Sequence, residues 1–360
     1  MKIYCYNSGC GDAFRIEFVG QSGDTRHILI DGGHSRTYRN VLAAELARIA
    51  SSKQRIDLCV VSHIHDDHIG GVETYINAVQ ADRAVDLVDQ WWFNAPRIPR
   101  VAPQNSTIAS EAKSIGQSDI IAGYLKSKDL LVKSSITSDS KPFILDGMEL
   151  TVLSPSKSKL KMLVDKYSDP KVTIEPHEDF QVTEAVARKS RDYHIRIEEF
   201  DFTNWKEDQN PENGGSIVVL TKYKGKQILW LADAHPSVVT NSLKSLGYSK
   251  EYPLECDFVK IAHHGSLGNN SVELYQLISC DNYILSVDGY NLHGLPSKAC
   301  LVNIITSSSR NRWNRCNFFL TCDDHPLRTI FNVDGDDVFE RYNFRMIFPS
   351  NEAIVELDMD

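Results

Sequence analysis

The sequence predicts an α/β protein in which clustered polar residues follow buried strands. Apolar runs of strand length alternate with amphipathic runs of helical spacing along much of the 360 residues. One apolar run, Leu58–Val61, leads directly into SHIHDDHIGG, and two later runs lead into LADA and HHGS. Because 42% of the residues are hydrophobic, the chain can bury a sizeable core. We therefore expect sheets whose edges present histidines and aspartates.

The first 33 residues are predicted to form strand, loop, strand, turn and strand. The loop covers Asn7–Ala13, the second strand covers Phe14–Phe18, and the third covers His27–Ile30 before Asp31-Gly32-Gly33. An amphipathic helix is predicted over 37–50, because its apolar residues fall on one face. These residues are Val41, Leu42, Leu46 and Ile49.

The later elements are less regular. Strands are predicted at Val85–Trp92, Leu150–Leu153, Ile217–Tyr223, Gln227–Leu231, Asn317–Thr321 and Thr329–Val333. Helices are predicted over 104–133 and 297–307. Residues 1–360 are interpreted as one domain, with an insertion at 156–212 and a C-terminal extension at 308–360 that completes or flanks a second sheet. The insertion begins with a predicted helix that carries Lys157, Lys159, Lys161 and Lys166.

The segment after Leu58–Val61 has the composition of a metal site. His63 and His65 lie two residues apart, so on a helix they would face different sides, whereas in a loop both can face one ion. Asp67 and His68 are adjacent and would face a second ion. Imidazole and carboxylate ligands suit Zn²⁺, Mn²⁺ or Fe. The alternative is a histidine-rich surface turn. The Gly70-Gly71 pair and the amphipathic run after it predict that the loop leads into a helix.

The HxHxDH motif resembles the signature of the metallo-β-lactamase fold superfamily. GDA followed by ILIDGG, and the later KIAHHGS, are similar to the metallo-hydrolase domain of competence channel (ComEC-type) proteins and to its soluble relatives. This resemblance implies a four-layer αββα sandwich with insertions. It also implies a dinuclear metal-dependent hydrolase.

The resemblance also implies the ligands of two divalent ions, Zn²⁺ or Mn²⁺. The first ion would be bound by His63, His65 and Asp233. The second would be bound by Asp67, His68, Asp233 and either His263 or His264. His264 is the favoured ligand, with His263 near the scissile phosphate or orienting the loop.

Three positions near these ligands are also informative. In the superfamily an aspartate at Asp31 braces the histidine loop by hydrogen bonds. Ala232 stands where relatives usually carry glycine. Leu295 stands where they carry a further histidine, and His293, two residues earlier, either replaces that histidine or is a spectator.

Two bound ions would lower the pKa of a bridging water to near neutrality. Asp66 or Asp67 would accept the proton of this water. Lys260, Ser266 and His293 are the residues predicted to stabilise the developing charge. For Lys260 the alternative is that the side chain reaches solvent.

Three functions fit these motifs. A phosphodiesterase or nuclease, with a nucleic-acid or nucleotide substrate, is favoured by HHGS. A hydrolase of a lactone, thioester or β-lactam-like bond is permitted, although such enzymes normally have a third histidine on the first metal. A non-catalytic metal-binding partner in a protein complex is the third function.

Charge and composition limit the partners and the cellular location that we expect for the protein. The net charge of −9 argues against broad nucleic-acid binding but allows a local basic groove. Arg310, Arg312 and Arg315 flank Trp313, a mixture that either contacts nucleic acid or forms a solvated turn. The eight cysteines are expected to be free thiols. Without a signal segment or an apolar run long enough to span a bilayer, we expect a cytoplasmic protein.

Overall fold

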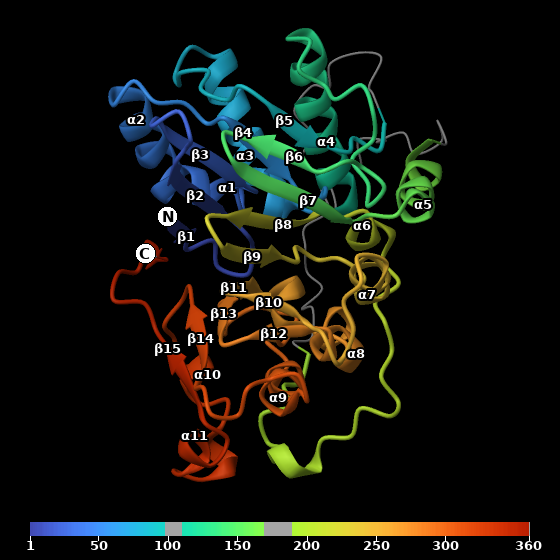
Figure 1. Ribbon diagram of the computed structural model, residues 1–360. Helices are drawn as coiled ribbons and strands as arrows, with labels where there is room; N and C mark the ends of the chain where they lie inside the picture. The colour runs from blue at the N-terminus through green and yellow to red at the C-terminus, as the bar shows by residue number, and fades with distance from the viewer. Residues whose placement is uncertain (98–109, 169–188, 360) are drawn as a thin grey trace, which may run out of the picture.

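The computed structural model describes residues 1–97, 110–168 and 189–359, which form four layers (Figure 1). Two sheets pack face to face, and helices cover the outer face of each. This αββα sandwich confirms the predicted fold class.

The first sheet has six strands in the order β16-β1-β2-β3-β4-β5. These strands are β1 (Lys2–Tyr6), β2 (Phe14–Val19), β3 (Thr25–Ile30), β4 (Leu58–Val61), β5 (Trp91–Phe93) and β16 (Ile354–Asp358). β16, β1, β2 and β3 are antiparallel neighbours, whereas β4 and β5 run parallel to β3. The helical segments of this half are α1 (Ser35–Thr37), a π-helical turn (Tyr38–Leu42), α2 (Ala43–Ser51), α3 (Asp66–Gln80) and α4 (Ser110–Ser127).

The second sheet has eight strands in the order β15-β14-β13-β11-β9-β8-β7-β6. These strands are β6 (Phe143–Leu145), β7 (Met148–Ser154), β8 (Val218–Tyr223), β9 (Lys226–Trp230), β11 (Phe258–Lys260), β13 (Asn282–Leu285), β14 (Cys316–Leu320) and β15 (Phe344–Ile347). Neighbours from β6 to β9 are antiparallel, and those from β9 to β15 are parallel. A small parallel pair is formed by β10 (Leu254–Cys256) and β12 (Ile278–Cys280).

Seven more helices follow in the described part of the chain, and the first of them packs on the core of the first sheet. They are α5 (Lys157–Ser168), α6 (Pro211–Gly214), α7 (Pro236–Ser245), α8 (Val272–Gln276), α9 (Lys298–Thr306), α10 (His325–Arg328) and α11 (Val338–Arg341). Short 3₁₀ turns lie at Ile197–Glu199, Ala262–Gly265, Leu267–Asn269 and Asn332–Asp334. None of the helices in the described ranges is long and apolar enough to cross a membrane.

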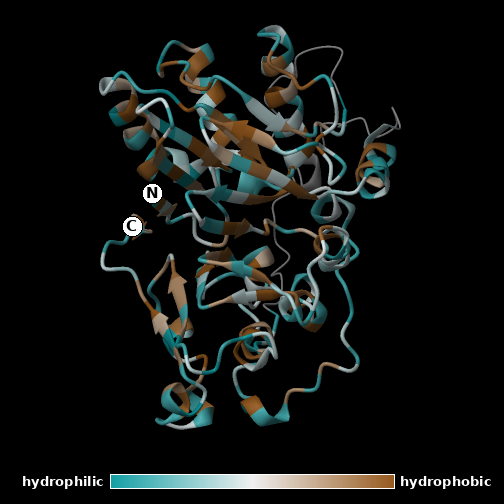
Figure 2. Cartoon of the chain, in the orientation of Figure 1, coloured by the Kyte–Doolittle hydropathy of each residue, from teal (hydrophilic) through white to brown (hydrophobic). Residues whose placement is uncertain are grey.

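Three apolar cores hold the four layers together. The central core joins the inner faces of the two sheets, where the rings of Phe14 and Trp230 lie 5.4 Å apart. A second core packs the first sheet against α2, α3 and α4, and a third packs the second sheet against α7, α8 and α9. Figure 2 shows the corresponding concentration of hydrophobic residues on the strands between the helical layers. Burial of this apolar surface is the main stabilising contribution to the fold.

Most predicted elements are present, and two are wrong. The strand predicted at Val85–Trp92 is reduced to β5 at its end. The strand predicted at Thr329–Val333 is instead turn and 3₁₀ structure after α10, because the Asp324 side chain caps that helix by accepting from Leu327 N.

Several predicted segments extend into residues outside the described ranges. The helix predicted over 104–133 is described as α4, and residues 104–109 lie outside the description. The lysine-bearing helix of the insertion is α5, and residues 169–188 of that insertion also lie outside the description. The C-terminal segment adds β14 and β15 to the second sheet, but β16 pairs with β1 in the first.

Candidate metal centre

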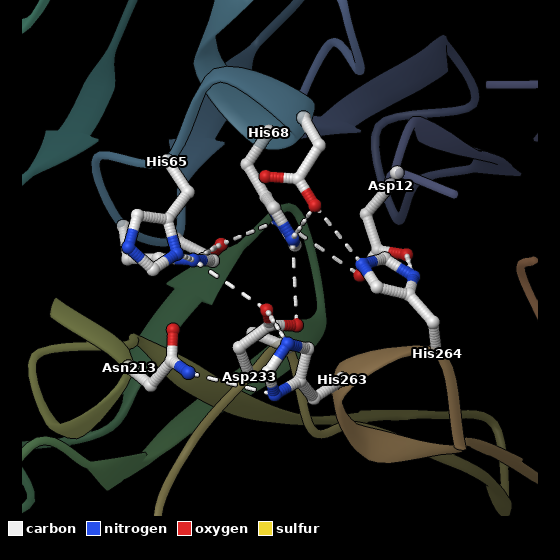
Figure 3. Close-up of polar contacts among 12 residues, drawn as sticks. Asp12, His65, His68, Asn213, Asp233, His263 and His264 are labelled. Carbon is white, nitrogen blue, oxygen red and sulfur yellow. Dashed lines mark hydrogen bonds and ion pairs between the residues drawn. The ribbon is translucent and has the colours of Figure 1, made fainter. Parts of the chain in front are cut away.

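The predicted metal ligands converge at one end of the sandwich (Figure 3). β9 leads to Asp233, and its parallel neighbour β11 leads to His263 and His264. Because neighbouring parallel strands end at the same edge of a sheet, these side chains are adjacent. From the first sheet, β4 leads to the loop that carries His63 and continues into α3.

One cluster consists of His63, His65 and Asp233. His63 Nε2 lies 3.1 Å from His65 Nδ1 and 3.6 Å from Asp233 Oδ2. The three ligand atoms all lie within 4.8 Å of one another. Two imidazole nitrogens and a carboxylate oxygen at this spacing fit a single divalent cation.

A second cluster consists of Asp67, His68, Asp233 and His264, with ligand atoms again within 4.8 Å of one another. His264 Nε2 lies 3.2 Å from Asp67 Oδ2, and His68 Nε2 lies 3.4 Å from Asp233 Oδ1. Among the described residues, His68 Nε2 and Asp233 Oδ1 are buried polar atoms without a hydrogen-bond partner. Such atoms cost about 1–3 kcal/mol each when unsatisfied, so the donor set fits a cation here as well.

The Asp233 carboxylate is shared by the two clusters. Its Oδ2 faces His63 and its Oδ1 faces His68. Burial alone would raise the pKa of Asp233, but the neighbouring charges of His263 and His68 outweigh burial and hold this pKa well below its usual range. The carboxylate is therefore ionised where it separates the two clusters.

Hydrogen bonds fix which imidazole nitrogen faces each cluster. His264 Nδ1 lies 2.8 Å from the Ser286 carbonyl oxygen, to which it donates, so His264 Nε2 keeps its lone pair. His68 Nδ1 lies 2.7 Å from Asp31 Oδ2. Asp31 also accepts from the backbone N–H and hydroxyl of Ser62, at 2.7 and 2.6 Å. These contacts confirm that Asp31 braces the histidine loop, a role that orients metal ligands.

Left-handed backbone aims the second pair of histidines. His263, His264 and Gly265 have φ of 45°, 52° and 82° in succession. Ala232, whose carbonyl accepts from His263 N at 2.8 Å, has φ of 46°. This conformation is costly for residues with a Cβ, so glycine would adopt it at position 232 with less strain.

Close packing of α3 positions Asp67 and His68 of the second cluster. The predicted helix follows Gly70-Gly71, whereas α3 already begins at Asp66. Asp67 and His68 therefore lie in its first turn. A Cβ on Gly71 would lie 2.0 Å from the Gly32 carbonyl oxygen. Only glycine therefore lets α3 approach the loop that follows β3 so closely.

The Lys260 side chain is buried, so the alternative in which it reaches solvent is wrong. It is only 1% exposed. Instead it forms a buried ion pair with Asp12, and it also donates to the Ala232 carbonyl at 3.3 Å. Sequence reasoning missed the role of Asp12, the aspartate of the GDA motif. Its Oδ1 lies 3.6 Å from His264 Nδ1.

Asp66 lies outside both clusters and is held by hydrogen bonds. Its carboxylate lies 2.7–3.2 Å from donor atoms of His34, Lys113 and Gln117. Burial opposes ionisation of Asp66, yet these hydrogen bonds lower its pKa to about 2.

Burial also opposes ionisation of Asp67, but the charge of His68 and the hydrogen bond to His264 hold its pKa well below the usual range. The two aspartates are therefore separated by position and not by pKa, because only Asp67 belongs to the second cluster.

The remaining predicted residues lie around the clusters. His263 Nε2 is 3.6 Å from Asp233 Oδ2, and His263 Nδ1 donates to Asn269 Oδ1 at 2.8 Å. Ser266 is half-buried, and its N–H donates to the His263 carbonyl at 2.8 Å. His293 lies on an exposed loop; partial burial, followed by the charge of His263, lowers its pKa.

The arginine-rich turn and the cysteines are the remaining predicted features. Arg310 and Arg312 donate to backbone carbonyls, among them those of Ile305 and Thr306 at the end of α9, so both have a structural role. Trp313 is 95% exposed. All eight cysteines are free, as predicted.

Part of the chain is similar to a known protein family. Residues 13–95 match the family model of the Metallo-beta-lactamase superfamily. The matched region contains β2 to β5 and the loop that carries His63 and His65. No curated protein matches the sequence closely enough to count as a relative.

Similar solved structures include the metallo-beta-lactamase fold protein YhfI from Bacillus subtilis, at 9% identity and a TM-score of 0.40, covering 99% of this chain and 100% of that one. Zn²⁺-bound PqqB from Methylobacterium extorquens is 9% identical with a TM-score of 0.39, covering 97% of this chain and 87% of that one.

Proposed function

We propose that this protein is a two-metal hydrolase, with Zn²⁺ or Mn²⁺, that cleaves phosphodiester bonds as a nuclease or as a hydrolase of small nucleotides. The observation that carries this proposal is the Asp233 carboxylate. Each of its oxygens faces a different histidine cluster, an arrangement suited to two ions that share one ligand.

The ligands follow from the two clusters. His63, His65 and Asp233 would hold one ion, and Asp67, His68, Asp233 and His264 would hold the other. Ions bound in this way supply a hydroxide at neutral pH and a positive field for the reacting oxygens. The protein supplies rigid, dry surroundings, since His63, His68, Asp233 and His264 are all buried.

The charge of the site favours an anionic substrate. Two divalent ions bring four positive charges, and among their ligands only Asp67 and Asp233 bring negative ones. Lys260 cancels the charge of Asp12 beneath the site.

Asp31, bonded to His68, and Asp208, near His263, add negative charge around the site, so the positive charge is local to the ions themselves. Two adjacent divalent ions would attract the oxygens of a phosphodiester more strongly than a neutral lactone or β-lactam.

His263 is the residue that we assign to proton transfer. Its side chain is 27% exposed, so its ring lies at the boundary between the buried ligands and solvent. Because Nδ1 is held by Asn269, Nε2 is the atom that would hold a proton for the leaving-group oxygen.

The test combines metal analysis with hydrolysis of bis-p-nitrophenyl phosphate and linear single-stranded DNA in added Mn²⁺ or Zn²⁺. Asp233→Ala should lose both metal and activity, and Asp201→Ala, at an exposed aspartate, should lose neither. DNA cleavage would identify a nuclease. Bound metal without phosphodiester hydrolysis would refute the proposal and favour a carboxylic-bond hydrolase or a non-catalytic partner.

A further inference from the structure

Asn213 lies beside the first cluster in a way that its sequence context does not indicate. It is in the single-turn helix α6, just before β8, and it is 2% exposed. The segment is tied to the histidine loop because Ile217 N donates to the Ser62 carbonyl at 2.9 Å. A short, buried turn thus places a polar side chain between His65 and His263 (Figure 3).

The orientation of the Asn213 carboxamide is fixed by its partner. Its Nδ2 lies 2.5 Å from Asp208 Oδ2. Because a carboxylate accepts hydrogen bonds and does not donate them, the nitrogen must be the atom that faces Asp208. The oxygen therefore points the other way. Figure 3 shows this oxygen directed toward the His65 side of the site and the nitrogen directed toward His263.

This oxygen has no hydrogen-bond partner among the described residues, although it is buried. An unsatisfied buried carbonyl costs about 1–3 kcal/mol, so it needs an explanation. The neighbouring cluster has three protein donors, His63, His65 and Asp233. The missing hydrogen bond of this oxygen is explained if its lone pair binds an ion that the three other ligands also hold.

A second amide makes the arrangement rigid. Asn269 Nδ2 donates to the same Asp208 oxygen at 3.0 Å and to the Asp233 carbonyl at 2.9 Å. Asp208 thereby links Asn213 to the segment that carries Asp233. A donor held by such a network needs little reorganisation to bind an ion.

We propose that the side-chain oxygen of Asn213 is a fourth protein ligand of the ion held by His63, His65 and Asp233. The proposal rests on the two-metal function above and extends it to the identity of the metal. An oxygen donor suits Mn²⁺, whereas an imidazole in its place would suit Zn²⁺. The carboxamide therefore shifts this site toward Mn²⁺ compared with a site of three histidines.

The test measures metal binding and not turnover. Metal-free wild-type protein, Asn213→Ala and Asn213→His are titrated with Mn²⁺ and with Zn²⁺ against a competing chelator, and bound metal is counted after gel filtration. Asn77→Ala is the matched control, because that amide lies on α3 and contacts Glu73. Circular dichroism of the metal-free forms checks that each variant is folded.

We expect Asn213→Ala to lose about tenfold or more in Mn²⁺ affinity at one of two sites, and Asn77→Ala to lose none. Asn213→His should raise the preference for Zn²⁺ over Mn²⁺ by about tenfold or more. If Asn213→Ala fails to fold, the His variant decides.

Unchanged affinities in Asn213→Ala, or an unchanged metal preference in Asn213→His, would overturn the ligand assignment while leaving the two-metal function intact. Wild-type protein that binds no metal would overturn the two-metal function itself.

Discussion

The buried ion pair between Lys260 and Asp12 should be a strong determinant of stability. Both side chains are almost fully buried, at 1% and 2% exposure. Lys260→Met keeps most of the volume of the side chain but leaves the Asp12 carboxylate without its counter-charge. Adding Asp12→Asn to this variant removes the unpaired carboxylate charge.

The magnitude follows from the contact and the burial. Two unit charges about 2.8 Å apart at an effective dielectric constant of about 20 attract each other by about 6 kcal/mol. Desolvation of both groups consumes much of this attraction, but removal of one partner leaves a buried charge unpaired. We therefore expect Lys260→Met to lower the free energy of unfolding by about 3–5 kcal/mol. The exposed pair Lys226–Asp257, at 3.3 Å, should contribute less than about 1 kcal/mol.

The assay is urea denaturation of the metal-free protein, followed by tryptophan fluorescence. Lys260→Met, Asp12→Asn and the double variant form a double-mutant cycle, with Lys226→Met as the surface control. The double variant should be more stable than the sum of the two single losses predicts, by about 1–3 kcal/mol. Strictly additive losses, or a Lys260→Met variant as stable as Lys226→Met, would refute this reasoning.

Three further outcomes are expected. Ala232→Gly should raise the free energy of unfolding by about 1 kcal/mol, because glycine adopts φ of 46° without a Cβ clash; a lower urea midpoint would contradict this. Hydrogen bonds from Ser22 and Arg26 lower the pKa of Asp146 from 3.8 to about 2. The stability that Asp146 contributes should therefore be complete above about pH 4 and disappear as the pH falls toward 2, so the urea midpoints of wild type and Asp146→Asn should converge in acid. Asp31→Ala removes a brace and no ligand, so it should weaken metal binding by about 10–100-fold in a chelator competition, and unchanged affinity would count against the brace.

The first sheet and the metal-binding motifs could be predicted because their signals are local. The strand Leu58–Val61 is bounded as predicted, since a run of four apolar residues ends abruptly at polar ones. Asp12 could not be assigned, because its partner Lys260 lies far along the chain and only the folded sheets bring them together. Asn213 precedes two glycines, a context typical of a turn. Its proposed role as a ligand depends on the direction of its side-chain oxygen, which the sequence does not indicate.

The choice between His263 and His264 was similarly out of reach from sequence alone. Both follow the same strand, and the preference for His264, which belongs to the second cluster, has no physical basis in the residues themselves. The Ser286 carbonyl selects His264 for the second cluster, whereas Asn269 holds His263 at the exposed side. These partners come from later parts of the chain, so the distinction is tertiary.

The pairing of β16 with β1 has a consequence for biosynthesis. β1 has β2 on one side and β16 on the other, in a register that joins Lys2 to Asp358 and Tyr6 to Ile354. On the ribosome, β1–β5 emerge long before β16, so one side of β1 offers unpaired amides and carbonyls throughout most of translation. Such an open strand edge is a site for erroneous pairing between nascent chains. The protein should therefore depend on chaperones until residues 354–358 emerge, and a chain that stops short of them should aggregate even with an intact metal-binding motif.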